Sequence, residues 1–283
     1  MKLDLAAVEE TAKHLYIQAL KILPPDIKDG FKRLDATETD PTAKSILATM
    51  IKNIDVAEDT TNLLCQDTGI PIYNILIGRG VEVDGHALKE AIRKGCERAT
   101  TEHPLRSSVV HPITRVNEQT SCGIKVPVIT IDFTDKDEFF EMEMIPKGSG
   151  SENGSFLKMC IPAEGVAGIK TFVVDKVMEV GGRVCPPTIV GVGVGGTSDL
   201  CTKLAKKAGA RPLGSVCEDP EGAKLEKELS AAVNMLGIGP QGLGGDSTAF
   251  AVHVETAATH NIMCHSARRA RATFTPKGVE IGF

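Results

Sequence analysis

Aromatic residues and long apolar runs are scarce in this sequence. Only 4% of its 283 residues are aromatic, with no tryptophan and two tyrosines, so it has little material for stacking nucleic acid bases. No apolar run approaches the length that a transmembrane helix needs. The segment Met1–Leu5 also lacks the uninterrupted apolar core of a secretory signal. We therefore expect a cytoplasmic protein with an aliphatic core and no membrane partner.

Positive charge is scarce as well. The formal net charge is -5 and the pI is about 5.9, and basic residues cluster only at 268–271, which read Arg-Arg-Ala-Arg. A nucleic-acid-binding protein usually carries an extended basic surface. We therefore expect no nucleic acid partner.

The eight cysteines form no C-x-x-C pair, which excludes zinc-ribbon and ferredoxin spacings. Without an export signal they indicate a reducing compartment, in which thiols stay free or bind metal. A free cysteine is most often a small buried hydrophobic residue, and we interpret five in this way: Cys96, Cys122, Cys160, Cys201 and Cys217. The other three stand at expected element boundaries, where a loop can present sulfur to a metal: Cys65, Cys185 and Cys264.

Apolar periodicity predicts an α+β fold. Helical spacing predicts helices over 5–23, 41–56, 163–181, 199–208 and 221–236, and another that begins at 84–85. Period-two alternation predicts a β-hairpin over 127–144, and strands follow at 188–194 and 248–254. We expect a helical N-terminal third and flanking helices packed on a largely antiparallel sheet, in a single domain over 1–283.

The stretch Cys65-Gln66-Asp67-Thr68-Gly69 places a soft metal ligand, an amide and a carboxylate just before a predicted break in the chain. Gln66 and Asp67 have a structural interpretation as turn caps, which is the commoner role of such residues. Their adjacency to a candidate metal ligand favours a functional one.

Three other features have the same two interpretations. The small-residue loop 147–155 is either a flexible connection or a backbone that approaches an anion closely. Arg106, and likewise the pair Arg268 and Arg269, are either surface charges or contacts to anionic groups.

The glycines of 191–196 satisfy G-x-G-x-x-G between a predicted strand and a predicted helix, so a dinucleotide site is an alternative. A βαβ unit would continue with an apolar strand ending in an acid, and 211–220 is not such a strand. We therefore interpret these glycines as a tight turn beside Cys185.

Five stretches together resemble the α subunit, or N-terminal half, of the class I iron–sulfur fumarases and L-tartrate dehydratases. They occur in family order over nearly the whole chain: Cys65-Gln66-Asp67-Thr68-Gly69, Lys147-Gly148-Ser149-Gly150-Ser151, Cys185-Pro186-Pro187 with Gly193 to Thr197, Gly242-Leu243-Gly244-Gly245, and Cys264-His265-Ser266-Ala267-Arg268-Arg269. Five matches in order are far more specific than any one of them.

The resemblance implies a [4Fe-4S] cluster held by Cys65, Cys185 and Cys264, with one iron left open as a Lewis acid. It also implies that Asp67 is the protein acid or base near the substrate hydroxyl. Contacts to the substrate carboxylates are implied for Gln66, Arg106 and the Gly150 backbone. His260 resembles the family's active-site histidine, but its separation from Cys264 is shorter than the family's, so His253 competes for that role.

The family's remaining catalytic groups belong to a β subunit or C-terminal domain, for which 1–283 has no counterpart. The resemblance therefore implies a β subunit partner, in an α2β2 complex, and a small dicarboxylate substrate. Fumarate, hydrated to L-malate, is the default substrate, with L-tartrate and mesaconate as alternatives. A non-catalytic iron–sulfur or nucleotide-binding regulatory subunit is the alternative from another class.

Overall fold

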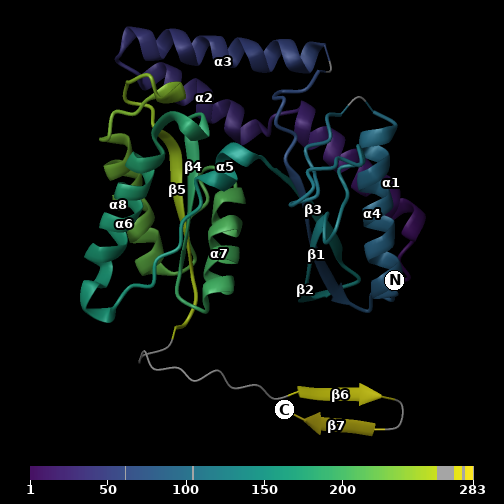
Figure 1. Cartoon of the computed structure of the whole chain (residues 1–283). Coiled ribbons are helices and arrows are strands. Elements are labelled where there is room, and N and C mark those ends of the chain that lie inside the picture. The colour runs from purple at the N-terminus through teal and green to yellow at the C-terminus, as the bar shows by residue number, and fades with distance from the viewer. Residues whose placement is uncertain (61, 104, 260–270, 276–277, 283) are drawn as a thin grey trace.

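The computed structural model describes residues 1–60, 62–103, 105–259, 271–275 and 278–282. Most of its elements form two lobes, with two helices over one of them, and a separate pair of strands lies apart from both (Figure 1). None of the helices in these ranges is long and apolar enough to cross a membrane.

The first lobe packs two helices against a three-stranded sheet. Its elements are α1 (Leu5–Lys21), β1 (Ile70–Arg79), α4 (Gly85–Thr101), β2 (Val128–Asp137) and β3 (Phe140–Lys147). Alternate residues of β1, namely Tyr73, Ile75 and Ile77, are buried against α1 and α4. Asp84 caps α4 by accepting the N–H groups of His86 and Ala87, as the predicted helix start requires.

The hairpin predicted over 127–144 is wrong in its pairing, although both strands form. The strand order is β2-β1-β3, with β1 parallel to β2 and antiparallel to β3. The connection between β2 and β3 crosses the end of β1 at Gly78, where an added Cβ would lie 2.3 Å from the Lys136 carbonyl oxygen. Period-two alternation identifies a strand but not its neighbour, and the most buried strand takes the centre.

The second lobe has a two-stranded parallel sheet between helices. Its elements are α6 (Gly165–Val180), β4 (Thr188–Val194), α7 (Ser198–Ala210), α8 (Pro220–Asn234) and β5 (Ala249–Thr256). Leu225, Leu229 and Val233 of α8 pack with Val173 of α6 and with the sheet. The helix α7 covers the opposite side (Figure 1).

The helices α2 (Pro25–Thr37) and α3 (Pro41–Asp59) lie over the second lobe, and α3 reaches toward the first (Figure 1). Asp40 caps α3 and Pro41 is its first residue, as predicted. Phe31 of α2 meets Phe250 of β5 edge to face, with ring centroids 4.9 Å apart. These two helices therefore have a core of their own that reaches the second lobe.

Short elements complete the description: α5 (Ser149–Asn153), η1 (Pro162–Glu164), η2 (Gly181–Val184), η3 (Pro240–Gly242), β6 (Arg271–Thr275) and β7 (Gly278–Gly282). The strands β6 and β7 pair with each other, antiparallel. The predicted α+β class is confirmed. The sheets are not largely antiparallel, however, because the β1–β2 and β4–β5 pairings are parallel.

Candidate active site

Cys65 and Asp67 lie in the turn between α3 and β1, at the boundary where the sequence predicted them. The Cys65 side chain is exposed, and its sulfur accepts a hydrogen bond from the Asp67 N–H at 3.4 Å. Thr68 is fully buried and donates its hydroxyl to the Arg106 carbonyl oxygen. Gly69 has a φ of 69°, and an added Cβ would lie 2.6 Å from the Lys147 carbonyl carbon, so this close turn requires glycine.

The Asp67 carboxylate is held by donors from the first residue of α5. Its Oδ2 accepts the Ser149 N–H at 2.7 Å and the Ser149 hydroxyl at 3.1 Å, while Oδ1 accepts the Gly69 N–H at 3.3 Å. An added Cβ on Gly148 would lie 2.7 Å from Oδ2, so glycine makes room for this approach. The carboxylate therefore has a fixed direction beside an exposed thiol.

Arg106 lies next to the same turn. Its Nη1 donates to the Gln66 carbonyl oxygen at 3.1 Å, and both side chains are exposed. The structure thus brings Cys65, Gln66, Asp67 and Arg106 together, although 40 residues separate Gln66 from Arg106. An exposed guanidinium in this position can bind an anionic group by donating hydrogen bonds to it.

Cys185 follows η2 and precedes β4, again at the predicted boundary. It is exposed and adopts the left-handed conformation, with φ 55° and ψ 61°, which is uncommon for a residue other than glycine. Behind it, Pro186 and Pro187 are buried, and the Pro186 carbonyl oxygen accepts the Gln241 N–H at 2.8 Å. The backbone therefore presents this thiol to solvent.

The helix α5 borders both cysteine-bearing segments. Ser149 contacts Asp67, and a Cβ on Gly150 would lie 3.5 Å from the Arg183 carbonyl oxygen, two residues before Cys185. The predicted loop over 147–155 therefore contains a helical turn. Gly150 therefore lies between the two segments.

The remaining predicted site residues, His260, Cys264, Arg268 and Arg269, lie outside the described residues. Within the described ranges, no group of three or more histidine, cysteine and acidic side chains could hold a metal. Cys65 and Cys185 are exposed free thiols at the ends of regular elements, which is the donor type that an iron–sulfur cluster needs. These two residues fit two of the three predicted ligands.

Comparison with known proteins bears on this arrangement. The model of the family described as fumarate hydratase (Fumerase) matches residues 9–273, which is most of the chain. The chain belongs to the Fumerase family.

Two relatives are similar to this chain over most of its length. A Methanocaldococcus jannaschii protein, provisionally named L(+)-tartrate dehydratase subunit alpha, is 42% identical over 274 residues, which cover 93% of this chain and 96% of that protein. The L(+)-tartrate dehydratase subunit alpha of Escherichia coli strain K12 is 35% identical over 238 residues, covering 84% of this chain and 78% of that protein.

The other cysteines of this Fumerase-family chain divide by burial. Cys96 and Cys122 are buried in the first lobe, as predicted. Cys160, Cys201 and Cys217 are only half-buried, so the prediction that they are core residues is wrong. Cys201 lies on α7, and Cys160 and Cys217 lie in connections between elements, where each side chain keeps partial solvent access.

His253, the alternative to His260, is a core residue. It is 2% exposed on β5, and its Nδ1 lies 3.1 Å from the Ala208 carbonyl oxygen of α7. Burial lowers its pKa, which keeps the ring neutral. The ring is therefore packed between β5 and α7.

The glycines of 191–196 are explained by packing. An added Cβ would lie 2.1 Å from the Ala205 carbonyl oxygen at Gly191 and 2.1 Å from the Cys201 carbonyl oxygen at Gly193. The absent side chains therefore let α7 lie directly on β4. The G-x-G-x-x-G match needs no nucleotide to account for it.

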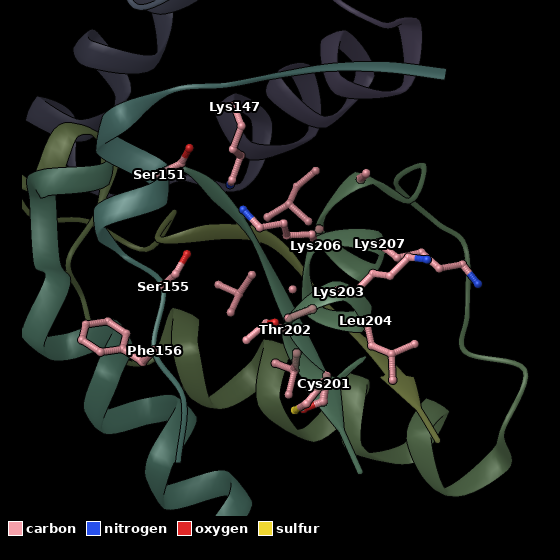
Figure 2. Close-up of a pocket in the computed structure, with 18 of the residues that line it drawn as sticks. Lys147, Ser151, Ser155, Phe156, Cys201, Thr202, Lys203, Leu204, Lys206 and Lys207 are labelled. Atoms are coloured by element: carbon pink, nitrogen blue, oxygen red, sulfur yellow. The ribbon is translucent and has the colours of Figure 1, made fainter. Parts of the chain in front are cut away.

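A cavity of about 1900 Å³ lies beside α5, β4 and α7 (Figure 2). Its lining is mostly apolar and includes Lys147 and Lys206, but not Cys65, Asp67 or Cys185. Lys147 and Lys206 point toward each other in it (Figure 2). Burial lowers the pKa of Lys147, the charge of Glu152 partly opposes this, and the charge of Lys206 adds to the lowering. The cavity is thus adjacent to the candidate active site and separate from it.

Sequence reasoning missed two residues that shape the site. Ser149 fixes the Asp67 carboxylate, and Thr68 ties the turn to the Arg106 segment. Both stand inside the motifs that carried the family resemblance. The turn motif Asp67-Thr68-Gly69 is a recognisable signal for Thr68, whereas the contact between Asp67 and Ser149 spans 82 residues.

Proposed function

We propose that this chain is the α subunit of an iron–sulfur hydro-lyase acting on a four-carbon dicarboxylate. The proposal rests on the arrangement at the Cys65 turn, where an exposed thiol, the oriented carboxylate of Asp67 and the guanidinium of Arg106 lie together. Membership of the Fumerase family supports lyase chemistry at this place.

Cys65, Cys185 and Cys264 would hold a [4Fe-4S] cluster. Two of them are exposed thiols on segments that both border α5, and the third stands in the family motif of the C-terminal region. When bound, the cluster supplies an iron without a protein thiolate, a Lewis acid that eases loss of the substrate hydroxyl.

Asp67 would act as the acid or base near the departing hydroxyl oxygen. Removing water from a 2-hydroxy dicarboxylate needs a base for the C–H hydrogen and an acid for the departing oxygen, and Asp67 acts near that oxygen. The two donors of Ser149 direct its Oδ2. Within the described part of the chain, Oδ1 accepts a hydrogen bond from Gly69 alone, at the longer distance of 3.3 Å, which leaves it the freer oxygen for proton transfer.

The substrate carboxylates would be bound by Arg106, Gln66 and the Gly150 backbone. The guanidinium is exposed and anchored through one nitrogen to the Gln66 backbone, and among the described residues its other N–H groups have no partner, so they can form charge-assisted hydrogen bonds. His260 is proposed as a further substrate contact by its place in the sequence.

A β subunit would complete the active site. The relatives from M. jannaschii and E. coli are both named as subunit alpha, which supports a β partner for this chain. We propose an α2β2 complex, with 1–283 as one iron–sulfur domain and the active site at the subunit boundary.

Two substrates have specific support. The family description favours fumarate, hydrated to L-malate, and the names of the relatives favour L(+)-tartrate, dehydrated to oxaloacetate. The hydrated forms, L-malate and L(+)-tartrate, share the two carboxylates and differ by one hydroxyl group, so the same residues would bind the carboxylates of either. The experiment must therefore measure both reactions, with mesaconate hydration as a third assay.

Iron and sulfide content after anaerobic reconstitution tests the cluster. We expect about four irons per chain in the unmodified protein and loss of iron with Cys65→Ser, Cys185→Ser or Cys264→Ser. Cys160→Ser is the matched control, because it removes a half-buried thiol on another segment. Equal loss in the control, or no iron in any protein, would contradict the ligand assignment.

Turnover tests the reaction. The chain, co-purified anaerobically with a β subunit of the same family, is assayed for fumarate hydration and for oxaloacetate formation from L(+)-tartrate. We expect one kcat/KM to exceed the other by at least about a hundredfold, because a site that binds a hydroxyl rejects the analogue without it. A cluster-loaded complex inactive on all three substrates would favour the regulatory role.

A further inference from the structure

Glu38 is a buried carboxylate at the turn between α2 and α3. It is 4% exposed, and it accepts hydrogen bonds from backbone N–H groups on both sides of a chain junction. Oε1 accepts from Thr39 and Asp40, each at 3.1 Å. The two oxygens accept from Asp246 at 3.0 and 3.1 Å, and Oε2 accepts from Ser247 at 3.0 Å. These charge-assisted hydrogen bonds hold the Glu38 carboxylate in one position.

The second side of this junction, at Asp246, also supplies a carboxylate that accepts hydrogen bonds from the α2–α3 turn. Asp246 Oδ2 accepts the Thr39 N–H at 3.0 Å and the Thr39 hydroxyl at 2.6 Å. An added Cβ on Gly245 would lie 2.5 Å from the Ala43 Cβ and 3.1 Å from Glu38 Oε1. The α2–α3 turn and the segment 245–247 are therefore in contact through two carboxylates and a glycine.

This segment ends a compact loop, 239–247. The tip of the loop, Gln241 and Gly242, contacts the Cys185 segment. The Gly244 N–H donates to the Ile238 carbonyl oxygen at 2.8 Å, and the Gln241 N–H donates to that of Pro186 at 2.8 Å. A Cβ on Gly242 would lie 2.4 Å from the Gly182 Cα. The tip of the loop thus lies directly against the backbone on both sides of Cys185.

The helix that begins at this junction also leads to Cys65. Asn53 of α3 donates its side-chain amide to the Leu64 carbonyl oxygen at 3.4 Å, one residue before Cys65. Gln241 at the loop tip donates to the Met50 sulfur of α3 at 3.8 Å. The Cys65 segment therefore contacts α3 directly, and the Cys185 segment is linked to α3 through Gln241.

We propose that Glu38 is a positioning residue for the metal ligand Cys185. Its carboxylate anchors the loop 239–247 on the α2–α3 turn, and the loop holds the Cys185 segment at a fixed separation from the Cys65 segment. The assignment rests on the proposed iron–sulfur site, and neither Glu38 nor Asp246 touches that site itself.

Amide hydrogen exchange of the metal-free chain tests the anchoring. Glu38→Gln should speed exchange at the Cys185, Gln241 and Ser247 amides by at least about tenfold, because a charged hydrogen-bond acceptor is lost. The matched control is Asp26→Asn, since Asp26 joins α2 to the Leu213 N–H at 2.8 Å, away from the loop. Unchanged exchange at Cys185 in Glu38→Gln, or equal acceleration there in Asp26→Asn, would overturn the proposal.

Iron release tests the consequence for the metal. After anaerobic reconstitution, Glu38→Gln should lose iron to a ferrous chelator about tenfold faster than the unmodified chain, and Asp26→Asn should not. Asp246→Asn, which weakens the same junction from the other side, provides a second variant if Glu38→Gln does not fold. Equal release rates in the unmodified chain and both junction variants would overturn the role.

The two measurements separate the failure of this inference from that of the proposed function. If the unmodified chain holds no iron and sulfide, the cluster and the role of Glu38 toward it both fail. If it holds the cluster but exchange at Cys185 is independent of Glu38, only the positioning role fails.

Discussion

At the scale of single residues, Asp67 has an oriented carboxylate beside the exposed thiol of Cys65. Asp67→Asn should lower turnover of the loaded αβ complex by about a hundredfold to ten-thousandfold, because an amide cannot act as the acid or base. The amide oxygen can still accept from the Ser149 N–H, so iron content should be unchanged. The measurement is kcat beside iron and sulfide content for each protein.

Ser149→Ala is the matched control for that substitution. It removes the weaker of the two Ser149 contacts, at 3.1 Å, and keeps the N–H contact at 2.7 Å. We expect a loss of at most about tenfold, corresponding to one hydrogen bond. Full activity in Asp67→Asn would rule out the assigned role.

Glu38 makes stability depend on pH. Burial acts to raise its pKa, but the N–H groups of Asp246, Asp40 and Ser247 together with the Ser247 side chain outweigh it, so the pKa lies below its ordinary value of 4.5. The folded state therefore binds this proton less readily than the unfolded state. The resulting stability is present above about pH 4.5 and is lost as the pH falls through the folded-state pKa.

We expect Glu38→Gln to lower the free energy of unfolding by about 2 to 3 kcal/mol at neutral pH. The difference from the unmodified chain should shrink as the pH is lowered from 7 to 3. Urea unfolding of both proteins across that range measures it. A difference that stays constant with pH would show that the charge of Glu38 is not what stabilises the junction.

At the scale of elements, the packing of α7 on β4 depends on missing side chains. Gly193→Ala would place a methyl group 2.1 Å from the Cys201 carbonyl oxygen, and the helix must move away. We expect a loss of about 1 to 3 kcal/mol in the free energy of unfolding. Urea denaturation followed by circular dichroism measures it.

Gly209→Ala is the control on the same helix. Its nearest neighbours would be Gly191 backbone atoms at 3.8 Å, an ordinary contact. Alanine also favours the helical state by about 1 kcal/mol relative to glycine. We therefore expect neutral or higher stability, and a loss matching that of Gly193→Ala would contradict the packing explanation.

At the scale of the whole molecule, the fold sorts its thiols by solvent access. Cys65 and Cys185 are exposed, whereas Cys96 and Cys122 are buried between α4 and the rest of the first lobe. In the native metal-free chain, iodoacetamide should alkylate the first pair at least about a hundredfold faster than the second, which reacts only after opening. Peptide mass spectrometry over time gives the individual rates.

Metal loading should change this pattern selectively. A cluster bound by Cys65 and Cys185 would protect these thiols from alkylation and leave the half-buried Cys160 as reactive as before. Protection of Cys160 together with the other two would indicate a global change in the chain rather than ligation.

The sequence by itself determined the local structure. Helical and period-two spacing predicted the helices and strands, and Asp40 and Asp84 marked two helix starts that the structure confirms. Turn and proline signals placed Cys65 and Cys185 at element ends, where they are exposed. These features depend on residues close in the chain, so periodicity and turn chemistry are sufficient to predict them.

Only the tertiary structure decided which elements are neighbours. It inserted β1 between β2 and β3, brought Ser149 to Asp67 across 82 residues, and brought Asp246 to Glu38 across 208. It also showed that the glycines of 191–196 serve helix packing and that His253 is buried. Local patterns fix which face of an element is apolar, but not which partner covers it, because that depends on the burial of the whole chain at once.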